Sequence, residues 1–452
     1  MIVLTGLSVY QLGQYSFWRD EIASVVFATA PFGELTRVLD RTREVAGLAN
    51  MASYYLLLHF WMPVVGDGES QVRLLSVIFG VATVVPVHLV ARRIAGWWAA
   101  VAATMIFALS PTVVEWNQQA RGYSLAMLVG AGLTLLLVLA VERRNAWLWL
   151  AYGLLASFGI YVHFFLGLVI AAHLGWVLLS RSWPGWVGAA AAAVPIAIAS
   201  APIPFLVAEH GGGHNWIDPL TVNVARESLS ALAGSPLLLV LLAACAGIGM
   251  LERRRERWFW LVAATALLPL LGIALISVVK PFFTGRYLVV ALPGVAIMAG
   301  VGLASLRSLP ARTALAAAVL LATLLALPSA YADIRQEHWR EAAGYVAQGA
   351  QPGDRIYLGT WSARPMTWYL ERDGQPIAPQ RILLPQAVER ATPRLWIVFG
   401  DPGSTDALRA RNRLEQQYDV VEERAFGTEV LVLLAEPAER VDAVGSVMGG
   451  PA

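Results

Sequence analysis

The stretch Ser16-Phe17-Trp18-Arg19-Asp20-Glu21 places two neighbouring carboxylates directly after the first apolar segment, residues 1–15, and ahead of a succession of long apolar runs. Ionisable side chains at the edge of a membrane are costly to place there, and by default they mark functional sites. The alternative is an interfacial anchor, with Trp18 among the lipid headgroups and Asp20 simply solvated. The rest of the chain has to decide between these two interpretations.

The composition indicates a polytopic membrane protein. Of the 452 residues, 57% are hydrophobic and 14% are charged, whereas soluble proteins carry about 25% charged residues. The net charge of +2 is too small to favour binding to nucleic acid. The single cysteine, Cys245, excludes intrachain disulfides and a thiolate metal cluster. Residues 1–15 lack the basic start and the cleavage site of a signal peptide, and they are short for a span, so the completeness of the first helix stays open.

The apolar segments predict a helical membrane domain over residues 1–330. Basic clusters such as Arg92-Arg93 fall in alternate loops, which indicates that those loops are cytoplasmic and that the Asp20 loop faces outward. Within this first outer loop, residues 16–66, three short helices are predicted to lie on the membrane surface, at 20–30, 32–45 and 52–65. About eleven transmembrane helices are expected, at 1–15, 73–91, 97–114, 123–141, 146–163, 165–180, 187–207, 227–250, 258–278, 286–306 and 312–330.

The composition changes near residue 331. A helix at 338–345, a turn at 351–354 and a strand at 355–358 are predicted, followed by a helix at 363–372 and strands at 395–399 and 429–434. This pattern predicts a small α/β domain over 331–437. The topology makes that domain extracytoplasmic, and the small, polar residues 438–452 read as a disordered tail.

The predicted outer face gathers most of the side chains that could carry chemistry. Arginine holds phosphate with a bidentate fork and stays charged when it is partly desolvated. A carboxylate within reach of a hydroxyl can serve as a general base. Together these groups describe transfer from a lipid phosphate to a hydroxyl. They are the carboxylates Asp20, Glu21 and Glu115, the cations Arg73, Arg121, Lys280 and Arg286, and the histidines His59, His163, His210 and His214.

Each candidate also has a purely structural interpretation. Asp20 would be a helix cap, and Arg286 would snorkel from the start of a helix. Arg121 would clamp an outer loop, and His163 would be a satisfied core histidine. The segment from Glu209 to His214, which holds three glycines, would be a mobile substrate loop or a metal site, although its spacing fits no standard zinc pattern.

An ordered set of motifs resembles the GT-C glycosyltransferases, in particular the protein O-mannosyltransferases and the lipid A aminoarabinose transferases of glycosyltransferase family 39 type. The resemblance covers most of residues 1–310. The motifs that carry it are Trp18-Arg19-Asp20-Glu21, Tyr54-Tyr55-Leu56-Leu57-Leu58-His59, Arg73-Leu74-Leu75-Ser76-Val77, Ser110-Pro111, Gln119-Ala120-Arg121-Gly122-Tyr123-Ser124, Tyr161-Val162-His163-Phe164 and Gly285-Arg286-Tyr287 near Pro293.

The resemblance implies roles for these residues. Asp20 would be the general base on the acceptor hydroxyl, and Glu21 would support it or bind a divalent metal together with it. Arg286 and Lys280 would neutralise the departing lipid phosphate. The other residues expected to bind substrate are Arg121, Tyr123, Tyr287, Glu115, His59, Arg73 and His163.

The chain also departs from these relatives. Asn50-Met51-Ala52-Ser53 stands where many of them have a His-Pro-Pro stretch, and the β-trefoil insert of the protein mannosyltransferases is absent. The sequence therefore does not support a protein acceptor.

The predicted outer face and the resemblance, which implies sugar transfer with inversion, together predict an inverting, multi-spanning glycosyltransferase of the bacterial plasma membrane. Its donor would be a polyprenyl-phosphate-linked monosaccharide, with mannose or a pentose favoured by analogy. Its acceptor would be a hydroxyl of a glycan or glycolipid at the outer face. Two other classes stay open: a lipid or sugar transporter or flippase, which would be expected to place its ionisable residues at mid-bilayer, and a non-catalytic scaffold that binds lipid-linked sugar.

Overall fold

The structure is a computed structural model, and the chain in it divides into two compact units. The helical unit comprises Met1–Gly13 and Phe27–Ala332, and the α/β unit comprises Gln14–Val26 and Asp333–Ala452. The stretch that carries Asp20 therefore belongs with the C-terminal domain, whereas the sequence grouped all of residues 16–66 with the membrane domain. The structure describes residues 1–32, 50–180, 183–203, 217–332, 337–359, 362–372, 380–382 and 394–438.

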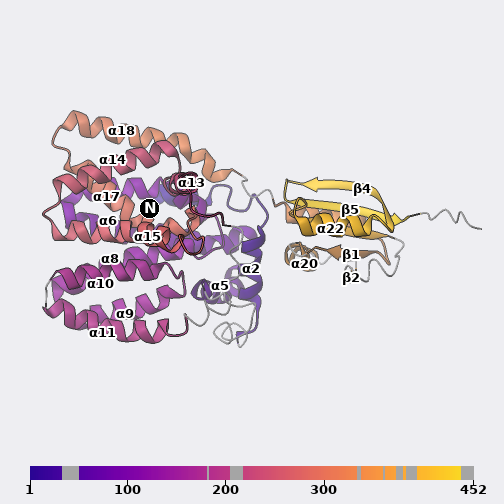
Figure 1. Ribbon diagram of the computed structural model, residues 1–452, viewed down its shortest axis with the longest axis horizontal. Coiled ribbons are helices and arrows are strands. Elements are labelled where there is room, and N and C mark those ends of the chain that lie inside the picture. Colours follow the sequence, from indigo (N-terminus) through magenta and orange to yellow (C-terminus); the bar gives the residue numbers. More distant parts are fainter. Residues whose placement is uncertain are drawn as a thin grey trace, which may run out of the picture. The chain divides into compact units, whose positions relative to one another are not determined.

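The helical unit is a bundle of apolar helices (Figure 1). Of the surface helices predicted in the first loop, the third is α5, with the predicted bounds, and the first overlaps α2 (Arg19–Thr29). Most of the second, at 32–45, lies outside the described residues. The helices of the unit are α1 (Ile2–Val9), α5 (Ala52–Val65), α6 (Glu69–Ala108), α7 (Pro111–Asn117), α8 (Tyr123–Arg143), α9 (Ala146–Ile160), α10 (Leu166–Leu179), α11 (Trp183–Ser200), α13 (Val222–Ala233), α14 (Pro236–Glu252), α15 (Arg257–Ile276), α16 (Gly285–Leu288), α17 (Leu292–Ser305) and α18 (Leu309–Ala326).

Five helical segments within the described residues are long and apolar enough to cross a membrane, and the bent pair α13 and α14 makes a sixth. The predicted helical membrane fold is confirmed, and the number of spans stays a prediction. The segment expected as a span at 227–250 is not one continuous helix, because α13 and α14 meet at an angle of 79°. Gly234 ends α13 in the left-handed region with φ +94°, and Pro236 starts α14 in its first turn.

The long helix α6 is a hairpin. Its backbone leaves helical geometry at Ala95 and Gly96. The His88 Nδ1 atom lies 3.1 Å from the Thr104 hydroxyl oxygen, sixteen positions further along the chain. Sixteen residues of straight helix would span about 24 Å, so the chain turns back on itself, as the predicted spans at 73–91 and 97–114 require.

Small residues let the buried helix α17 approach its neighbours closely. A Cβ atom at Gly302 would overlap the carbonyl oxygen of Cys245 on α14, and one at Gly300 would overlap the backbone of Ala103 on α6. Close backbone approach through small residues is the usual way in which membrane helices gain packing contacts, because lipid supplies no hydrophobic drive between them. These contacts fix α17 against α14 and α6.

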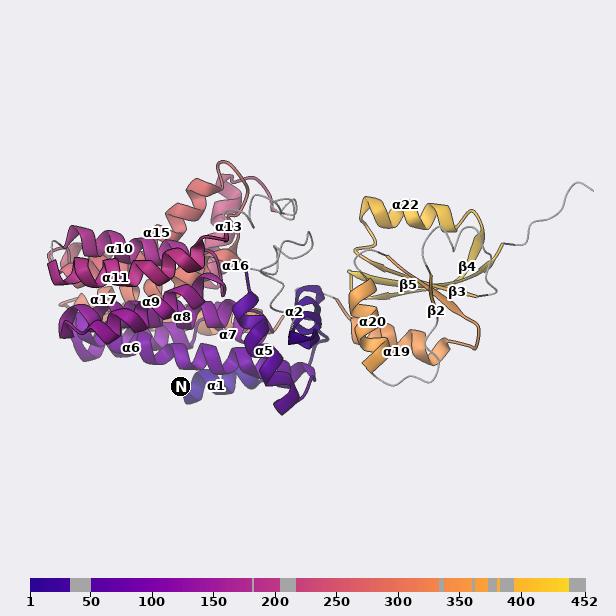
Figure 2. The same cartoon turned by 90° about the horizontal axis from the view of Figure 1, so that it is seen from below.

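The α/β unit has a five-stranded sheet in the order β2-β1-β3-β5-β4. Strands β2, β1 and β3 are parallel, and β5 and β4 are antiparallel to their neighbours. Helices α19 and α20 cover one face of the sheet and α22 covers the other (Figure 2). The elements are α19 (Trp339–Gly349), β1 (Arg355–Leu358), α20 (Ala363–Arg372), β2 (Gln380–Ile382), β3 (Leu395–Gly400), α22 (Thr405–Leu414), β4 (Tyr418–Phe426) and β5 (Val430–Pro437).

Alternation along the strands builds this core. Leu395, Ile397 and Phe399 of β3 point towards α22 and join one buried cluster, whereas Trp396, between them, contacts the ring of Tyr345 on α19. The strand β4 was not predicted, because most of its residues are exposed and no apolar alternation marks it. The predicted disordered tail lies outside the described residues, apart from Ala438.

Candidate functional site

The first candidate region is the start of helix α2, in the α/β unit. Trp18 occupies the N-cap position, and its backbone N–H donates to the Glu21 Oε2 atom at 3.3 Å. Glu21 is the third residue of the helix and is fully buried. A glutamate that reaches back to the N-cap in this way satisfies one of the four backbone donors that a helix start leaves without a partner inside the helix. Glu21 therefore has a structural task in addition to the catalytic support predicted for it.

Asp20 has a different environment from its neighbour. It lies in the first turn of α2 and is partly exposed. The positive end of the helix dipole favours negative charge in a first turn. One turn later, the Ser24 hydroxyl donates to the Asp20 carbonyl oxygen at 3.1 Å, which ties the backbone of Asp20 into the helix. Of the two predicted carboxylates, Asp20 is thus the more exposed one.

Sequence reasoning missed a third carboxylate at the same helix start, that of Glu337. Its Oε2 atom accepts the backbone N–H of Arg19 at 2.8 Å and the indole N–H of Trp339 at 2.8 Å. Its Oε1 atom lies 3.8 Å from the Arg19 guanidinium. No local sequence pattern predicts that Glu337 contacts this helix start, because Arg19 and Glu337 are 318 positions apart.

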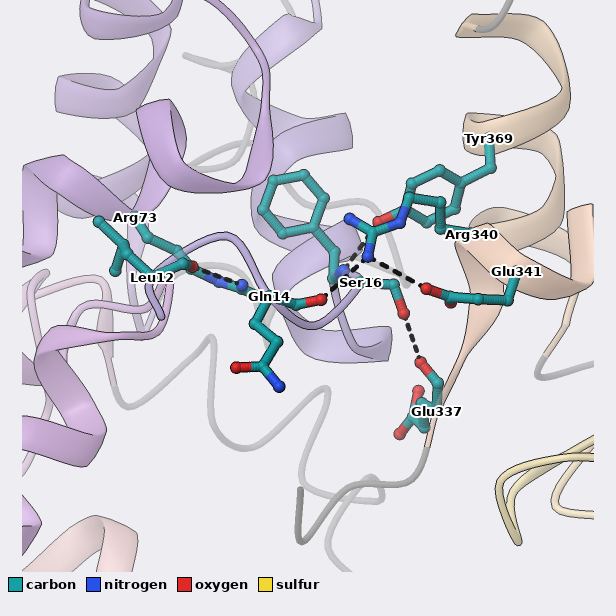
Figure 3. Close-up of polar contacts among 9 residues, drawn as sticks. Leu12, Gln14, Ser16, Arg73, Glu337, Arg340, Glu341 and Tyr369 are labelled. Atoms are coloured by element: carbon teal, nitrogen blue, oxygen red, sulfur yellow. Dashed lines mark hydrogen bonds and ion pairs between the residues drawn. The ribbon is translucent and has the colours of Figure 1, made fainter. Parts of the chain in front are cut away.

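The residues before α2 are held by hydrogen bonds to the C-terminal part of the α/β unit (Figure 3). The Ser16 hydroxyl donates to the Glu337 carbonyl oxygen at 2.7 Å, and the Phe17 backbone N–H donates to the Tyr369 hydroxyl at 2.7 Å. The Arg340 guanidinium donates to the Gln14 carbonyl oxygen at 3.0 Å. We call the stretch 14–21, together with Glu337, the carboxylate helix start.

The second candidate region lies in the helical unit and centres on Arg121. The Arg121 Nη1 atom donates to the Tyr55 hydroxyl at 3.3 Å, and the Arg121 carbonyl oxygen accepts the Ser76 hydroxyl at 3.4 Å. The Tyr54 hydroxyl lies 2.9 Å from that of Ser76. Both tyrosines are buried and lie in the first turn of helix α5. These contacts bring together three of the motifs quoted from the sequence.

Aromatic rings extend this region from Tyr123. The His163 ring centroid lies 5.8 Å from that of Tyr123 and 5.6 Å from that of Tyr287. His163 is fully buried, and its Nδ1 atom accepts the Phe165 backbone N–H at 3.3 Å. Its Nε2 atom has no hydrogen-bond partner among the residues that the structure describes. Because Nδ1 accepts, the proton is assigned to Nε2, which gives a buried donor beside two tyrosine rings.

The predicted phosphate-binding cations Lys280 and Arg286 come from the segment that carries the Tyr287 ring. The Lys280 ammonium lies 5.7 Å from the centroid of the Phe282 ring, which in turn contacts Phe165 and Tyr287. Arg286 precedes Tyr287 in the short helix α16 and is partly exposed. The members of this arginine–aromatic cluster are Tyr55, Arg121, Tyr123, His163, Phe165, Lys280, Phe282 and Tyr287. The structure thus brings together Arg121, Tyr123, His163, Lys280 and Tyr287, and their place on the outer side of the membrane stays a prediction.

The other predicted binding residues have separate surroundings. Arg73 is buried and donates to the Leu12 carbonyl oxygen at 2.9 Å, so it anchors the chain beyond α1 (Figure 3). The His59 Nδ1 atom lies 2.7 Å from the Ala28 carbonyl oxygen. Glu115 is partly exposed on α7. Their predicted substrate contacts stay predictions.

No group of three or more His, Cys, Asp or Glu side chains within the described ranges is arranged to hold a metal ion. Glu209, His210 and His214 lie outside those ranges. The suggestion that Asp20 and Glu21 bind a divalent metal stays a prediction, and the hydrogen bond from the Trp18 backbone already occupies one oxygen of Glu21.

Comparisons with known proteins agree with this architecture. Residues 51–207 match the family model of dolichyl-phosphate-mannose-protein mannosyltransferases. No curated protein sequence matches the chain. Among solved structures, the fold is similar to that of ArnT from Cupriavidus metallidurans in the apo state, with a TM-score of 0.64, 14% identity and coverage of 95% of each chain. The same protein bound to undecaprenyl phosphate gives a TM-score of 0.63 at 14% identity, with 96% of each chain covered.

Two larger proteins are also similar. The arabinofuranosyltransferase AftD from Mycobacteria gives a TM-score of 0.55 at 16% identity, over 97% of this chain and 40% of that one. The oligosaccharyltransferase AglB from Archaeoglobus fulgidus, in complex with an inhibitory peptide and a dolichol-phosphate, gives 0.54 at 10% identity, over 84% of this chain and 64% of that one. The matches define a multi-pass membrane protein. The chain has the GT-C fold, and the resemblance predicted from its sequence is confirmed.

Proposed function

We propose that the protein is a glycosyltransferase that moves a monosaccharide from a polyprenyl-phosphate donor to a hydroxyl of a glycan or glycolipid. The reaction would take place at the outer face of a plasma membrane, with the α/β unit on the same, extracytoplasmic side. The proposal is supported by the GT-C fold over nearly the whole chain and by the lipid phosphate that similar folds bind, undecaprenyl phosphate in ArnT and dolichol-phosphate in AglB.

The observation that carries the mechanism is the contrast between the two adjacent carboxylates. Glu21 is buried and caps helix α2, whereas Asp20 is partly exposed in the same first turn. A general base must reach the proton that it removes. Asp20 therefore takes the proton of the acceptor hydroxyl, while Glu21 and the helix dipole keep the first turn in place.

The displacement is a single step with inversion. The acceptor oxygen forms a bond to the anomeric carbon as the bond from that carbon to the phosphate oxygen breaks. The electron pair of the broken bond stays on the phosphate, and the hydroxyl proton moves to the Asp20 carboxylate. Positive side chains held near the leaving phosphate stabilise the charge that develops there. Arg121, Lys280 and Arg286 supply such charge in the helical unit, with the rings of the cluster excluding water.

The test is transfer by membranes that contain the wild-type protein, supplied with undecaprenyl phosphate linked to radiolabelled mannose, arabinofuranose or aminoarabinose. We expect one donor to yield a labelled glycan or glycolipid whose anomeric configuration, read by NMR, is inverted. Membranes without the protein give the background, and Glu371→Gln, which changes an exposed carboxylate on α20, gives the matched control.

Three outcomes would contradict the proposal. Label that crosses sealed vesicles without forming a new glycosidic bond would make the protein a transporter or flippase. Tight binding of undecaprenyl phosphate without transfer from any of the donors would make it a scaffold. Retention of the anomeric configuration would exclude the single displacement and would require a covalent intermediate.

A further inference from the structure

The carboxylate of Glu337 lies at the first backbone N–H of the helix that carries Asp20. That N–H belongs to Arg19, the residue directly before Asp20, and it donates to Oε2 at 2.8 Å. The first N–H groups of a helix have no partner inside the helix, so a carboxylate placed there forms a charge-assisted hydrogen bond and also interacts favourably with the dipole. Glu337 thus does for α2, from a distant part of the chain, what a capping side chain usually does locally.

The position of the Glu337 carboxylate is itself fixed. The indole N–H of Trp339 donates to the same Oε2 atom at 2.8 Å, and Trp339 is 1% exposed at the start of α19. The side chain of Glu337 is 6% exposed. A carboxylate that is held by a buried indole has little freedom to move. The hydrogen bond from Arg19 to this carboxylate therefore fixes the start of α2 relative to the core of the α/β unit.

Three further hydrogen bonds hold the approach to α2. Ser16 donates to the carbonyl oxygen of Glu337 itself, at 2.7 Å, and the Phe17 N–H donates to the hydroxyl of the buried Tyr369. Arg340 binds the Gln14 carbonyl oxygen at 3.0 Å. The chain before Asp20 is therefore fixed at several points by residues of the C-terminal domain. A surface loop that only connected two elements would not need so many partners.

We propose that Glu337 is a positioning residue for the reaction: it fixes the start of α2 and thereby the place from which the Asp20 carboxylate meets the acceptor hydroxyl. This inference rests on the proposed function, in which Asp20 is the base. It gives the C-terminal α/β domain a role in the chemistry, because that domain supplies Glu337, Trp339 and Tyr369.

The substitutions at Glu337 separate position from charge. Glutamine has the same length, and its amide oxygen can accept the N–H groups of both Arg19 and Trp339. It gives up the ion pair with Arg19, whose side chain is 37% exposed, and such pairs contribute little. Alanine removes the acceptor altogether. Aspartate keeps the charge but is one methylene too short to reach the same donors.

The experiment measures sugar transfer, affinity for undecaprenyl phosphate and hydrogen–deuterium exchange of the peptide 14–26 in the full-length protein. The variants are Glu337→Ala, Glu337→Asp, Glu337→Gln, Asp20→Asn and the exposed control Glu371→Gln. We expect kcat to fall about 100-fold in Glu337→Ala, the loss that a displaced catalytic group typically causes. Undecaprenyl phosphate affinity should stay unchanged, exchange in 14–26 should be faster, and Glu337→Gln should recover kcat to within about threefold.

Failure of the inference and failure of the proposed function give different results. Wild-type kcat in Glu337→Ala, with Asp20→Asn inactive, would overturn the positioning role and leave the function standing. Wild-type transfer by Asp20→Asn would overturn both. A loss in Glu337→Ala that Glu337→Gln does not recover would assign the effect to charge and contradict positioning. If Glu337→Ala does not accumulate, Glu337→Asp gives the same test, and unchanged kcat and exchange in that variant would contradict the proposal.

Discussion

The carboxylate helix start and the arginine–aromatic cluster are built in different ways. The first depends on partners far away in the sequence: the Arg19 N–H bonds to a residue 318 positions on, and the Phe17 N–H to one 352 positions on. The second is assembled from the ends of successive helices, with Arg121 and Tyr55 only 66 positions apart. The first is rich in carboxylates, and the second in cations and rings.

The two regions match two separate requirements of the proposed transfer reaction. Binding of an anionic lipid phosphate needs positive charge and apolar rings at the edge of the membrane. Activation of a hydroxyl needs a carboxylate on a fixed backbone. In the proposed reaction, the arginine–aromatic cluster of the helical unit meets the first requirement and the carboxylate helix start of the α/β unit meets the second, so their contributions to activity can be changed one at a time.

The largest effect is expected at Asp20. Replacing it with asparagine removes the general base but keeps the size of the side chain and its place in the first turn. General bases contribute about 10²- to 10⁴-fold, so transfer in Asp20→Asn should fall by about a thousandfold. Initial rates with a saturating labelled donor measure this. Rates within about threefold of wild type would remove Asp20 from the chemistry.

The next largest effect is expected at Arg121, on the other side of the comparison. Arg121→Ala removes a guanidinium that the Tyr55 hydroxyl holds in place. A hydrogen bond to a charged group contributes about 1.5–3 kcal/mol, so the Kd for undecaprenyl phosphate should rise by about 10- to 100-fold. Arg121→Lys serves as the control, because it keeps the charge and loses the fork. Donor affinity that is unchanged in Arg121→Ala would exclude this residue from phosphate binding.

A smaller effect, on stability, is expected at Glu21. Glu21→Ala removes the buried acceptor of the Trp18 N–H, and loss of a helix cap costs about 1–2 kcal/mol. Glu21→Gln keeps an acceptor and should lose less. Thermal unfolding of the purified protein measures both variants. The opposite pattern, full stability with transfer reduced as strongly as in Asp20→Asn, would make Glu21 a catalytic residue instead of a cap.

The smallest effect is a pH dependence of stability that Glu337 introduces. Burial raises the pKa of the Glu337 carboxyl above its ordinary 4.5, and the nearby Asp20 carboxylate adds to this, while the hydrogen bonds from Trp339 and Arg19 and the charge of Arg19 oppose it. A raised pKa means that the folded state holds the proton more tightly than the unfolded state. The raised pKa of Glu337 therefore adds to the free energy of unfolding at low pH. This contribution is fully present below the pKa of the unfolded state and is lost as pH rises through the pKa of the folded state.

Glutamine at position 337 cannot titrate, so it provides the reference for this pH dependence. The Tm of wild type relative to that of Glu337→Gln should fall as pH rises from about 4 to about 8, across the ordinary glutamate range and above it. A difference in Tm that is constant with pH, or that grows in favour of wild type, would contradict the direction of the pKa shift.

Much of the helical unit could be predicted from the sequence because the signals are local. Apolar length gave α5 its bounds, and the alternation of basic loops placed Arg121, Tyr123, His163 and Tyr287 at one end of the spans. The break between α13 and α14 was missed, although Gly234 and Pro236 are the usual residues at such a break. The apolar residues on either side of the break were joined into one predicted span, because apolar content alone does not record a change of helix direction.

The carboxylate helix start could be predicted only in part. The sequence identified Asp20 and Glu21, and the glutamate three positions after Trp18 is a pattern that permits capping. Which of the two carboxylates is buried depends on how the helix packs, and that information is not local. Glu337 was out of reach altogether, since a single glutamate before a helix carries no periodic signal and its partner lies in the first loop.

The most direct test of this account measures donor affinity and sugar transfer together in Asp20→Asn and Arg121→Ala, in matched membranes that contain equal amounts of protein. The two variants should show opposite patterns. Asp20→Asn should bind undecaprenyl phosphate like wild type and fail to transfer, whereas Arg121→Ala should bind it weakly and recover part of its transfer at high donor concentration. The same pattern in both variants, or full transfer in Asp20→Asn, would contradict the division of the reaction between the carboxylate helix start and the arginine–aromatic cluster.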